Sequence, residues 1–274
     1  MILVFFILIS GGFLWIPINY VSAQDSGTHV CGLISEDQTW DASDGPYYIE
    51  CDLTIANGAT LTVTPGTVLQ FDTNTILEVK GSLIAEGTEE EPVVFKNYDP
   101  TEDSWDAWRG IWLKRSSSAS FNHVVMEGTE ELTGNLNINS NDVVLKNSVF
   151  KDLTSIRIEG VDPVIENCDF YQTRLSYHNE ESTYLDARHN YWGDSSGPYH
   201  SQLNPDGKGS TITGNVLFEP WSRYPNNTEG DYPQTDDILN YHSWTGAANS
   251  TPMICDPINS VFGNYVYTAQ DIIL

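Results

Sequence analysis

The chain has 274 residues, with 12 Lys and Arg against 38 Asp and Glu, and its formal net charge at pH 7 is −26. Nucleic acids and anionic membrane surfaces are bound through neutralising cations, so this charge balance argues against either as a partner. Hydrophobic residues make up 40% of the chain and aromatic residues 12%. This composition excludes disorder throughout and indicates an acidic globular protein with a packed core.

Residues 1–23 carry no charged side chain and begin with an apolar run. Gly11-Gly12 and Pro17 interrupt this segment, and Val21-Ser22-Ala23 ends it with the small residues that a signal peptidase reads. Although it lacks a basic start, the segment predicts a cleaved signal peptide and a secreted or cell-surface protein. The alternative is an uncleaved anchor, which would make this segment the membrane contact of the chain.

Residues 24–44 are expected to form an N-terminal cap segment. The cysteines predict how this segment is held to the strands that follow. Cys31 and Cys51 bracket a turn-rich stretch and predict a disulfide in an oxidising compartment. Cys168 stands at an apolar repeat position and is interpreted as a small buried side chain. With Cys255, these cysteines form no C-x-x-C pair, so a zinc ribbon or a redox motif has no support.

From residue 45 to residue 222 the chain consists of short β-rich runs separated by Gly, Asn, Asp and Pro, without sustained helical periodicity. Within these runs an Asn recurs at intervals of 25, 20 and 23 residues, at Asn122, Asn147, Asn167 and Asn190. A recurring Asn suits the corner of a parallel β-helix, because Asn tolerates a left-handed backbone and stacked amides hydrogen-bond along the axis. The repeat predicts an all-β parallel solenoid of about seven coils.

Two sets of motifs make the prediction more specific. Pro65-Gly66 opens an apolar coil, and L-x-V-x-G-x-L-x-A-x-G-T over residues 77–88, a strand led by Pro92 and W-x-G-I over residues 108–111 follow it. Residues 190–221 then contain N-x-W-G, S-G-P, N-P-x-G-x-G and F-x-P-W in that order. Together they resemble the opening and closing coils of secreted, pectate-lyase-like proteins with a single-stranded right-handed parallel β-helix.

The resemblance covers residues 45–222 and implies an extracellular, often carbohydrate-associated setting. The same solenoid carries lyases, hydrolases, adhesins and inert surface proteins, so the resemblance does not choose an activity. The closing motifs predict a terminal cap in which Trp192 and Trp221 cover the last apolar coil. Residues 223–274 are interpreted as a polar linker followed by the start of a second module or by added edge strands.

Four charged residues are the candidate catalytic groups, because acid–base chemistry on a polysaccharide needs carboxylates or bases gathered on one exposed face. They are Arg157, Glu159, Asp186 and Arg188, which we expect on neighbouring outward faces. The competing interpretation, which we favour, is a ladder of surface ion pairs, since strand alternation places polar residues outward.

Calcium is the ion that the oxygen-rich loop N-P-D-G-K-G favours, with Asn204 and Asp206 as candidate ligands. The loop lacks the full twelve-residue EF-hand pattern, and Lys208 would oppose a cation. A solvated turn is therefore the favoured interpretation, and no other cofactor is predicted.

Aromatic side chains on an outward strand face can stack on sugar rings, and core packing or capping is their alternative role. The candidate glycan-binding residues are Trp105, Trp112, Tyr177 and Tyr184. We expect an extracellular or cell-surface module, structural or glycan-binding and without catalysis, whose partner is a polysaccharide or cell-surface glycan. A polysaccharide lyase or glycoside hydrolase acting along the solenoid face, and an adhesin tethered through its tail, are the alternatives.

Overall fold

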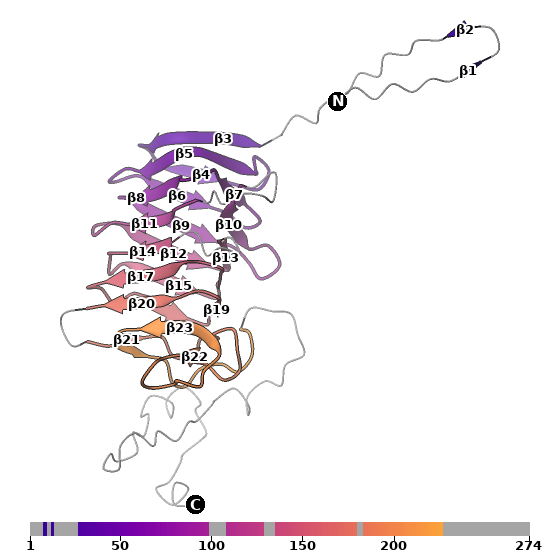
Figure 1. The fold of residues 1–274 in the computed structure, drawn as a ribbon. Helices are drawn as coiled ribbons and strands as arrows, with labels where there is room; N and C mark the ends of the chain where they lie inside the picture. The colour runs from indigo at the N-terminus through magenta and orange to yellow at the C-terminus, as the bar shows by residue number, and fades with distance from the viewer. Residues whose placement is uncertain are drawn as a thin grey trace, which may run out of the picture.

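The computed structural model describes residues 8–9, 12–13, 27–98, 108–128, 135–179 and 183–226. All regular secondary structure within these residues is β-strand, as the sequence predicts (Figure 1). No helix long and apolar enough to cross a membrane was found in the described part. Of the expected signal peptide, the description covers only β1 (Leu8–Ile9) and β2 (Gly12–Phe13), which pair antiparallel.

Most strands belong to three walls of parallel sheet. The first wall consists of β4 (Gln38–Trp40), β6 (Thr60–Val63), β9 (Ser82–Glu86), β12 (Ser118–Asn122), β15 (Val143–Lys146) and β18 (Val164–Glu166). The second wall consists of β7 (Val68–Phe71), β10 (Val93–Asn97), β13 (Val124–Glu127), β16 (Val149–Lys151) and β19 (Asp169–Tyr171). The third wall consists of β8 (Ile76–Val79), β11 (Gly110–Leu113), β14 (Asn135–Ile138), β17 (Ser155–Glu159), β20 (Leu175–His178) and β23 (Gly209–Thr213).

The remaining strands lie at the two ends. The long strand β5 (Tyr47–Ile55) belongs to two walls, since its first half pairs with β7 and its second half with β8, and β3 (Thr28–Ile34) pairs with it. At the other end, β21 (Leu185–Asp186) pairs with β24 (Val216–Leu217), and β22 (Pro198–Tyr199) pairs with β23.

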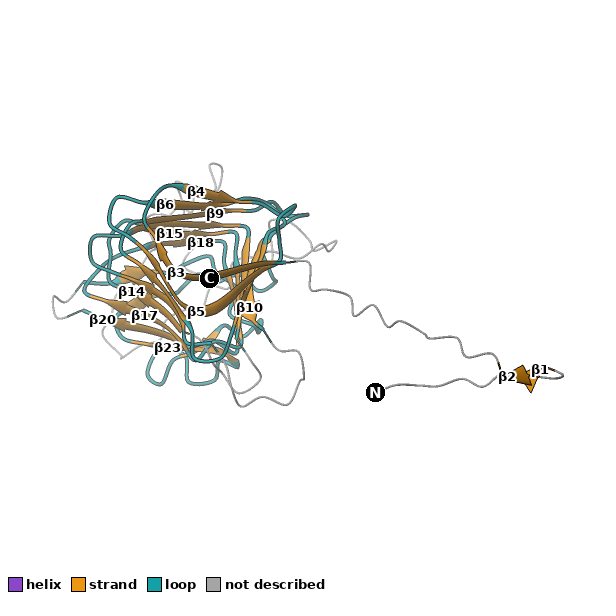
Figure 2. Ribbon diagram, turned by 90° about the horizontal axis from the view of Figure 1, so that it is seen from above, coloured by secondary structure: helices purple, strands orange, loops and turns teal. Residues whose placement is uncertain are grey.

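The chain visits the walls in rotation. From β6 to β17, each strand pairs in parallel with the strand three places further along the sequence, so three consecutive strands make one coil. Seen from above, the walls surround one interior (Figure 2). Seven strands stack in the third wall when the second half of β5 is included, in agreement with the predicted number of coils. This all-β, mostly parallel architecture is compatible with a β-helix-like solenoid.

The interior is built from rows of apolar residues that occupy the same register in successive coils. Strand alternation turns every second residue inward, so each coil covers the apolar floor of the next. On the third wall one such row, 0–2% exposed throughout, runs through Leu53, Leu77, Ile111, Leu136, Ile156, Leu175 and Ile212. On the second wall the matching row contains Leu69, Phe95, Met126, Phe150 and Phe170.

The recurring Asn residues do lie at a corner, between the first and second walls, but they do not share one register. Asn147 and Asn167 take the expected left-handed backbone, with φ of 48° and 53°. His123 and His189 hold the same corner in other coils, with φ of 49° and 62°. The prediction that all four Asn residues hold one corner position is therefore wrong, because this corner requires a left-handed backbone, which His also adopts here.

Asn122 and Asn190 lie one residue to either side of that corner position. The Asn122 side-chain oxygen accepts a hydrogen bond of 2.9 Å from the amide of Asn147. Asn190 turns inward and is fully buried, above Cys168, whose backbone N–H donates to its side-chain oxygen over 2.8 Å. The Asn190 amide in turn donates to the backbone oxygen of Ile165 in the neighbouring coil and to that of Ala187 in its own coil. Asn190 thus satisfies backbone groups where the regular walls end.

Both ends of the stack have dedicated structures. At the start, Cys31 of β3 and Cys51 of β5 form the expected disulfide, with Cα atoms 5.2 Å apart. At the finish, Trp192 and Trp221 are fully buried, and Trp192 stacks on Phe170 with ring centroids 4.6 Å apart. Both indoles thus cover apolar residues at the end of the stack, where the sequence predicts a terminal cap. Of residues 223–274 only 223–226 are described, so the predicted linker and second module lie outside the described residues.

Candidate glycan-binding face

The outward side of the third wall carries a continuous row of polar and aromatic side chains, which we call the outer track. Cross-strand pairing places them in one register, one from each coil: Glu78, Trp112, Asn137, Arg157, Ser176 and Thr213. Parallel strands lie about 4.8 Å apart, so the outer track presents one side chain at each such interval. A regular row of this kind suits an extended ligand better than a compact one.

Trp112 is the aromatic centre of the outer track. The guanidinium carbon of Arg109 lies 5.1 Å from its ring centroid and the Nζ of Lys114 lies 5.0 Å from it, both within cation–π range. The indole N–H of Trp112 is buried and has no hydrogen-bond partner in the structure. The ring therefore offers apolar surface with cationic donors beside it.

Glu78, beside Trp112, is held in its ionised form. Its carboxylate oxygens lie 2.6 Å from the Nζ of Lys80 and 3.0 Å from the Nζ of Lys114. The hydrogen bond from Lys80 lowers the pKa of Glu78 most, and Lys114 adds to it, against a smaller opposing effect of burial. A carboxyl group with a lowered pKa is a poor general acid, so Glu78 is better suited to orienting its lysines than to donating a proton.

The candidate catalytic residues form two separate ion pairs. On β17, Arg157 donates from Nε to Glu159 over 2.5 Å. Arg188, which lies two residues after β21, donates from Nε and Nη2 to Asp186 of β21 over 2.9 and 2.6 Å. Burial raises the pKa of Asp186, but the hydrogen bonds and charge of Arg188 outweigh it and lower this pKa overall.

The two ion pairs, which we expected on neighbouring outward faces, lie in separate sheets. Arg157 is paired across strands with Asn137 and Ser176 in the third wall. Asp186, in contrast, is paired with Leu217 in the separate sheet of β21 and β24. Because consecutive strands turn through the three walls, the strand that stacks on β17 in the next coil is β20 and not β21.

The other candidate aromatic residues divide into an exposed and a buried one. Tyr184 is 61% exposed, whereas Tyr177 is only 3% exposed. The Tyr177 hydroxyl donates to Asp162 over 2.6 Å, and its ring has no free face on which a sugar could stack. Trp105 lies outside the described residues. Of the four residues, Trp112 is therefore the one placed within the outer track.

Of the two candidate calcium ligands, Asn204 has a structural role inside its own loop. Asn204 is 7% exposed, and its side-chain amide donates to the backbone oxygens of Ser196 and Pro198 over 3.0 and 2.8 Å. Asp206 is exposed on the same loop. Within the described residues no group of three or more His, Cys, Asp or Glu is arranged to hold a metal ion.

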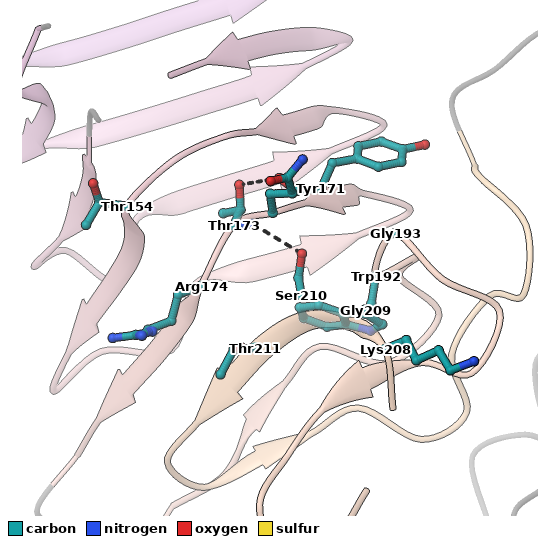
Figure 3. Close-up of a pocket in the computed structure, with 11 residues that line it drawn as sticks. Thr154, Tyr171, Thr173, Arg174, Trp192, Gly193, Lys208, Gly209, Ser210 and Thr211 are labelled. Carbon is teal, nitrogen blue, oxygen red and sulfur yellow. Dashed lines mark hydrogen bonds between the residues drawn. The ribbon is translucent and has the colours of Figure 1, made fainter. Parts of the chain in front are cut away.

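A hollow of about 430 Å³ opens beside the lower end of the outer track, where the second and third walls meet (Figure 3). Its lining includes Arg174, Trp192, Lys208, Ser210 and Thr211. Sequence reasoning missed this site, since it depends on bringing residues 154, 171–174, 192–193 and 208–211 together. The two basic residues, rare in this acidic chain, are the one signal in the sequence that could have drawn attention to it.

Comparison with known proteins leaves the family open. No family model matches the chain, and no solved structure matches it. A segment of 83 residues is 31% identical to a part of the Drosophila melanogaster protein named Protein bark beetle. The match covers 30% of this chain and 3% of the fly protein, so the similarity concerns a small part of that relative.

Proposed function

We propose that this chain is a secreted or cell-surface module with a right-handed, pectate-lyase-like parallel β-helix, and that it binds an extended glycan along the outer track without catalysing its cleavage. The β-helix assignment rests on the rotation of strands through three walls together with the motifs at residues 65–111 and 190–221. The extracellular location rests on the apolar first 23 residues and on the Cys31–Cys51 disulfide, which persists in oxidising compartments.

The observation that carries glycan binding is the placement of Trp112 in one register with amide and hydroxyl side chains. Sugar rings present apolar faces and hydroxyl edges, so they are recognised by an aromatic ring beside hydrogen-bonding groups. Trp112 supplies the ring, and Asn137 and the exposed Thr213 supply an amide and a hydroxyl further along the outer track. Arg109 and Lys114, beside the indole, add donors for sugar oxygens.

A binding role without catalysis agrees with the state of the acidic groups on this face. Glu159 is engaged by Arg157 on the same strand, and Glu78 is engaged by two lysines. Glycoside hydrolysis uses two carboxyl groups placed on either side of the scissile bond, one of them with a raised pKa. The lowered pKa of Glu78 is opposite to what a general acid requires.

Calorimetric titration of the purified protein with a panel of neutral and acidic polysaccharides tests this proposal. At least one polysaccharide should bind, and Trp112→Ala should weaken its binding about tenfold, because the apolar platform is lost. Val164→Ala, which removes an apolar side chain that is 40% exposed on β18 of the first wall, is the control and should bind like the unaltered protein. Release of reducing ends or unsaturated uronates, with or without calcium, would overturn the proposal, as would the absence of any binding.

A further inference from the structure

The hollow at the junction of the second and third walls is preorganised for a ligand. Its volume of about 430 Å³ falls within the roughly 300–1,000 Å³ typical of small-ligand sites. The Thr173 hydroxyl donates to the backbone oxygen of Tyr171 over 2.9 Å, and the Thr173 N–H donates to the hydroxyl of Ser210 over 3.2 Å. Ser210 in turn donates to the backbone oxygen of Phe170 over 2.9 Å. These bonds hold the floor of the hollow in place (Figure 3).

The rim of the hollow is cationic. Figure 3 shows Arg174 and Lys208 on opposite sides of Ser210. Neither basic side chain is within ion-pair distance of a carboxylate in the described part of the chain, and no Asp or Glu lines the hollow. The chain has 12 basic residues against 38 acidic ones, so two cations without a salt bridge at one opening are unusual here, although the charge of Lys208 also acts on nearby Asp194. They favour an anionic ligand over a neutral one.

The carboxylates next to the lining are already engaged. Asp194 accepts hydrogen bonds from the hydroxyl and backbone N–H of Ser196 over 2.6 and 2.8 Å, and these bonds, with a smaller contribution from the charge of Lys208, lower its pKa. Asp152 lies 3.9 Å from the Nζ of Lys151. The positive potential of Arg174 and Lys208 is therefore only partly offset by these neighbours.

The lining also includes an indole with an unused donor. Trp192 is fully buried, and its ring N–H has no hydrogen-bond partner in the structure. A buried donor without a partner is costly, which makes a ligand oxygen a favourable addition near this residue. The hollow thus combines cations, hydroxyl groups and an aromatic side chain.

We propose that this hollow is an anion subsite, which binds the sulfate or carboxylate group of an acidic sugar residue through Arg174 and Lys208. The inference rests on the proposed glycan-binding function and names its substrate class. Thr211 and Arg174 both line the hollow, and each directly precedes one of the paired residues Ile212 and Leu175, at the edge of the outer track. An extended acidic glycan could therefore occupy the hollow and the outer track together.

The test compares a double variant, Arg174→Ala with Lys208→Ala, with the unaltered protein in calorimetric titrations. The probes are a sulfated oligosaccharide, a uronate oligosaccharide and a neutral oligosaccharide of the same length. The double variant should lose on the order of tenfold in affinity for an acidic probe and change little for the neutral one, because charge-assisted hydrogen bonds are lost. Whichever acidic probe is affected more identifies the anion as sulfate or carboxylate.

The matched control removes the same two charges elsewhere, with Lys96→Ala and Lys146→Ala on the second and first walls. Equal losses in the control and the double variant would overturn the anion subsite, since net charge alone would then explain them. Equal affinity of the unaltered protein for neutral and acidic probes would also overturn it. If Trp112→Ala still weakens binding in these cases, the proposed function stands and only the subsite fails. If no probe binds at all, both fail.

Discussion

The middle coils and the two ends of this molecule solve the same packing problem by different means. In the middle, every apolar row has a similar side chain above and below it, as in the third-wall row from Leu77 to Leu175. At the ends the row has a neighbour on one side only. There the chain uses devices that occur once: the Cys31–Cys51 disulfide at the start, and Trp192, Trp221 and the buried Asn190 at the finish.

The difference shows that repetition is sufficient for stability only where a coil has neighbours on both sides. A terminal coil must cover its apolar face and satisfy its backbone groups without a following coil. Large indoles supply the cover, and Asn190 accepts or donates bonds that a further strand would otherwise make. A single substitution at either end should therefore lower the free energy of unfolding more than a substitution of the same size on the outer face of a middle coil.

The largest effect is expected for Trp221→Ala. Trp221 is fully buried, and removal of a buried indole costs about 3–5 kcal/mol in the free energy of unfolding. Trp112→Ala, which removes an indole from the outer face of a middle coil, should cost about 1 kcal/mol. Urea denaturation followed by circular dichroism measures both, and equal losses would show that the ends have no special role.

A smaller effect is expected for the disulfide. Cys31 and Cys51 are 20 residues apart, and opening a loop of this length costs about 3 kcal/mol in the chain-entropy model. The double variant Cys31→Ser with Cys51→Ser should lower the denaturation midpoint by an amount that corresponds to this loss of free energy. Added reductant should then not lower the midpoint of the double variant any further. A reductant-sensitive midpoint in the double variant would assign the sensitivity to other cysteines and contradict this account of the first coil.

The smallest effect concerns Cys168, which fills the corner beneath Asn190. Burial raises the pKa of the Cys168 thiol to about 12, above its ordinary value of 9.0. The folded protein keeps this proton where the unfolded chain releases it, so the stabilisation is complete below about pH 9 and is lost as the pH rises toward 12.

Two measurements check this prediction in a Cys255→Ser background. A thiol reagent at pH 8 should leave Cys168 unmodified until the protein is unfolded, because the reactive species is the thiolate. The stability advantage over Cys168→Ala should shrink above pH 9. Rapid modification of the folded protein at pH 8 would show that the corner is open to solvent.

Much of the fold could be predicted from local pattern, whereas the candidate site could be predicted only in part. Strand alternation predicted that polar residues point outward, and the small residue Cys168 was expected to be buried, as it is. Spacing alone could not give register, so Asn122 and Asn190 were assigned to the same corner position as Asn147 although each lies one residue away. Likewise the outward charges of β17 and β21 were grouped, although the structure separates them.

The sequence by itself determined the all-β class, the parallel stacking, the disulfide and the indoles of the terminal cap, because alternation, turn residues and cysteine spacing act over short stretches of chain. Only the tertiary structure decided which side chains meet on a wall, since that depends on the exact number of residues in every intervening coil. The tertiary structure alone places Trp112 in the outer track, and it alone brings Arg174 and Lys208 to the same hollow. A shift of one residue in any coil would turn the side chains that follow to the opposite face.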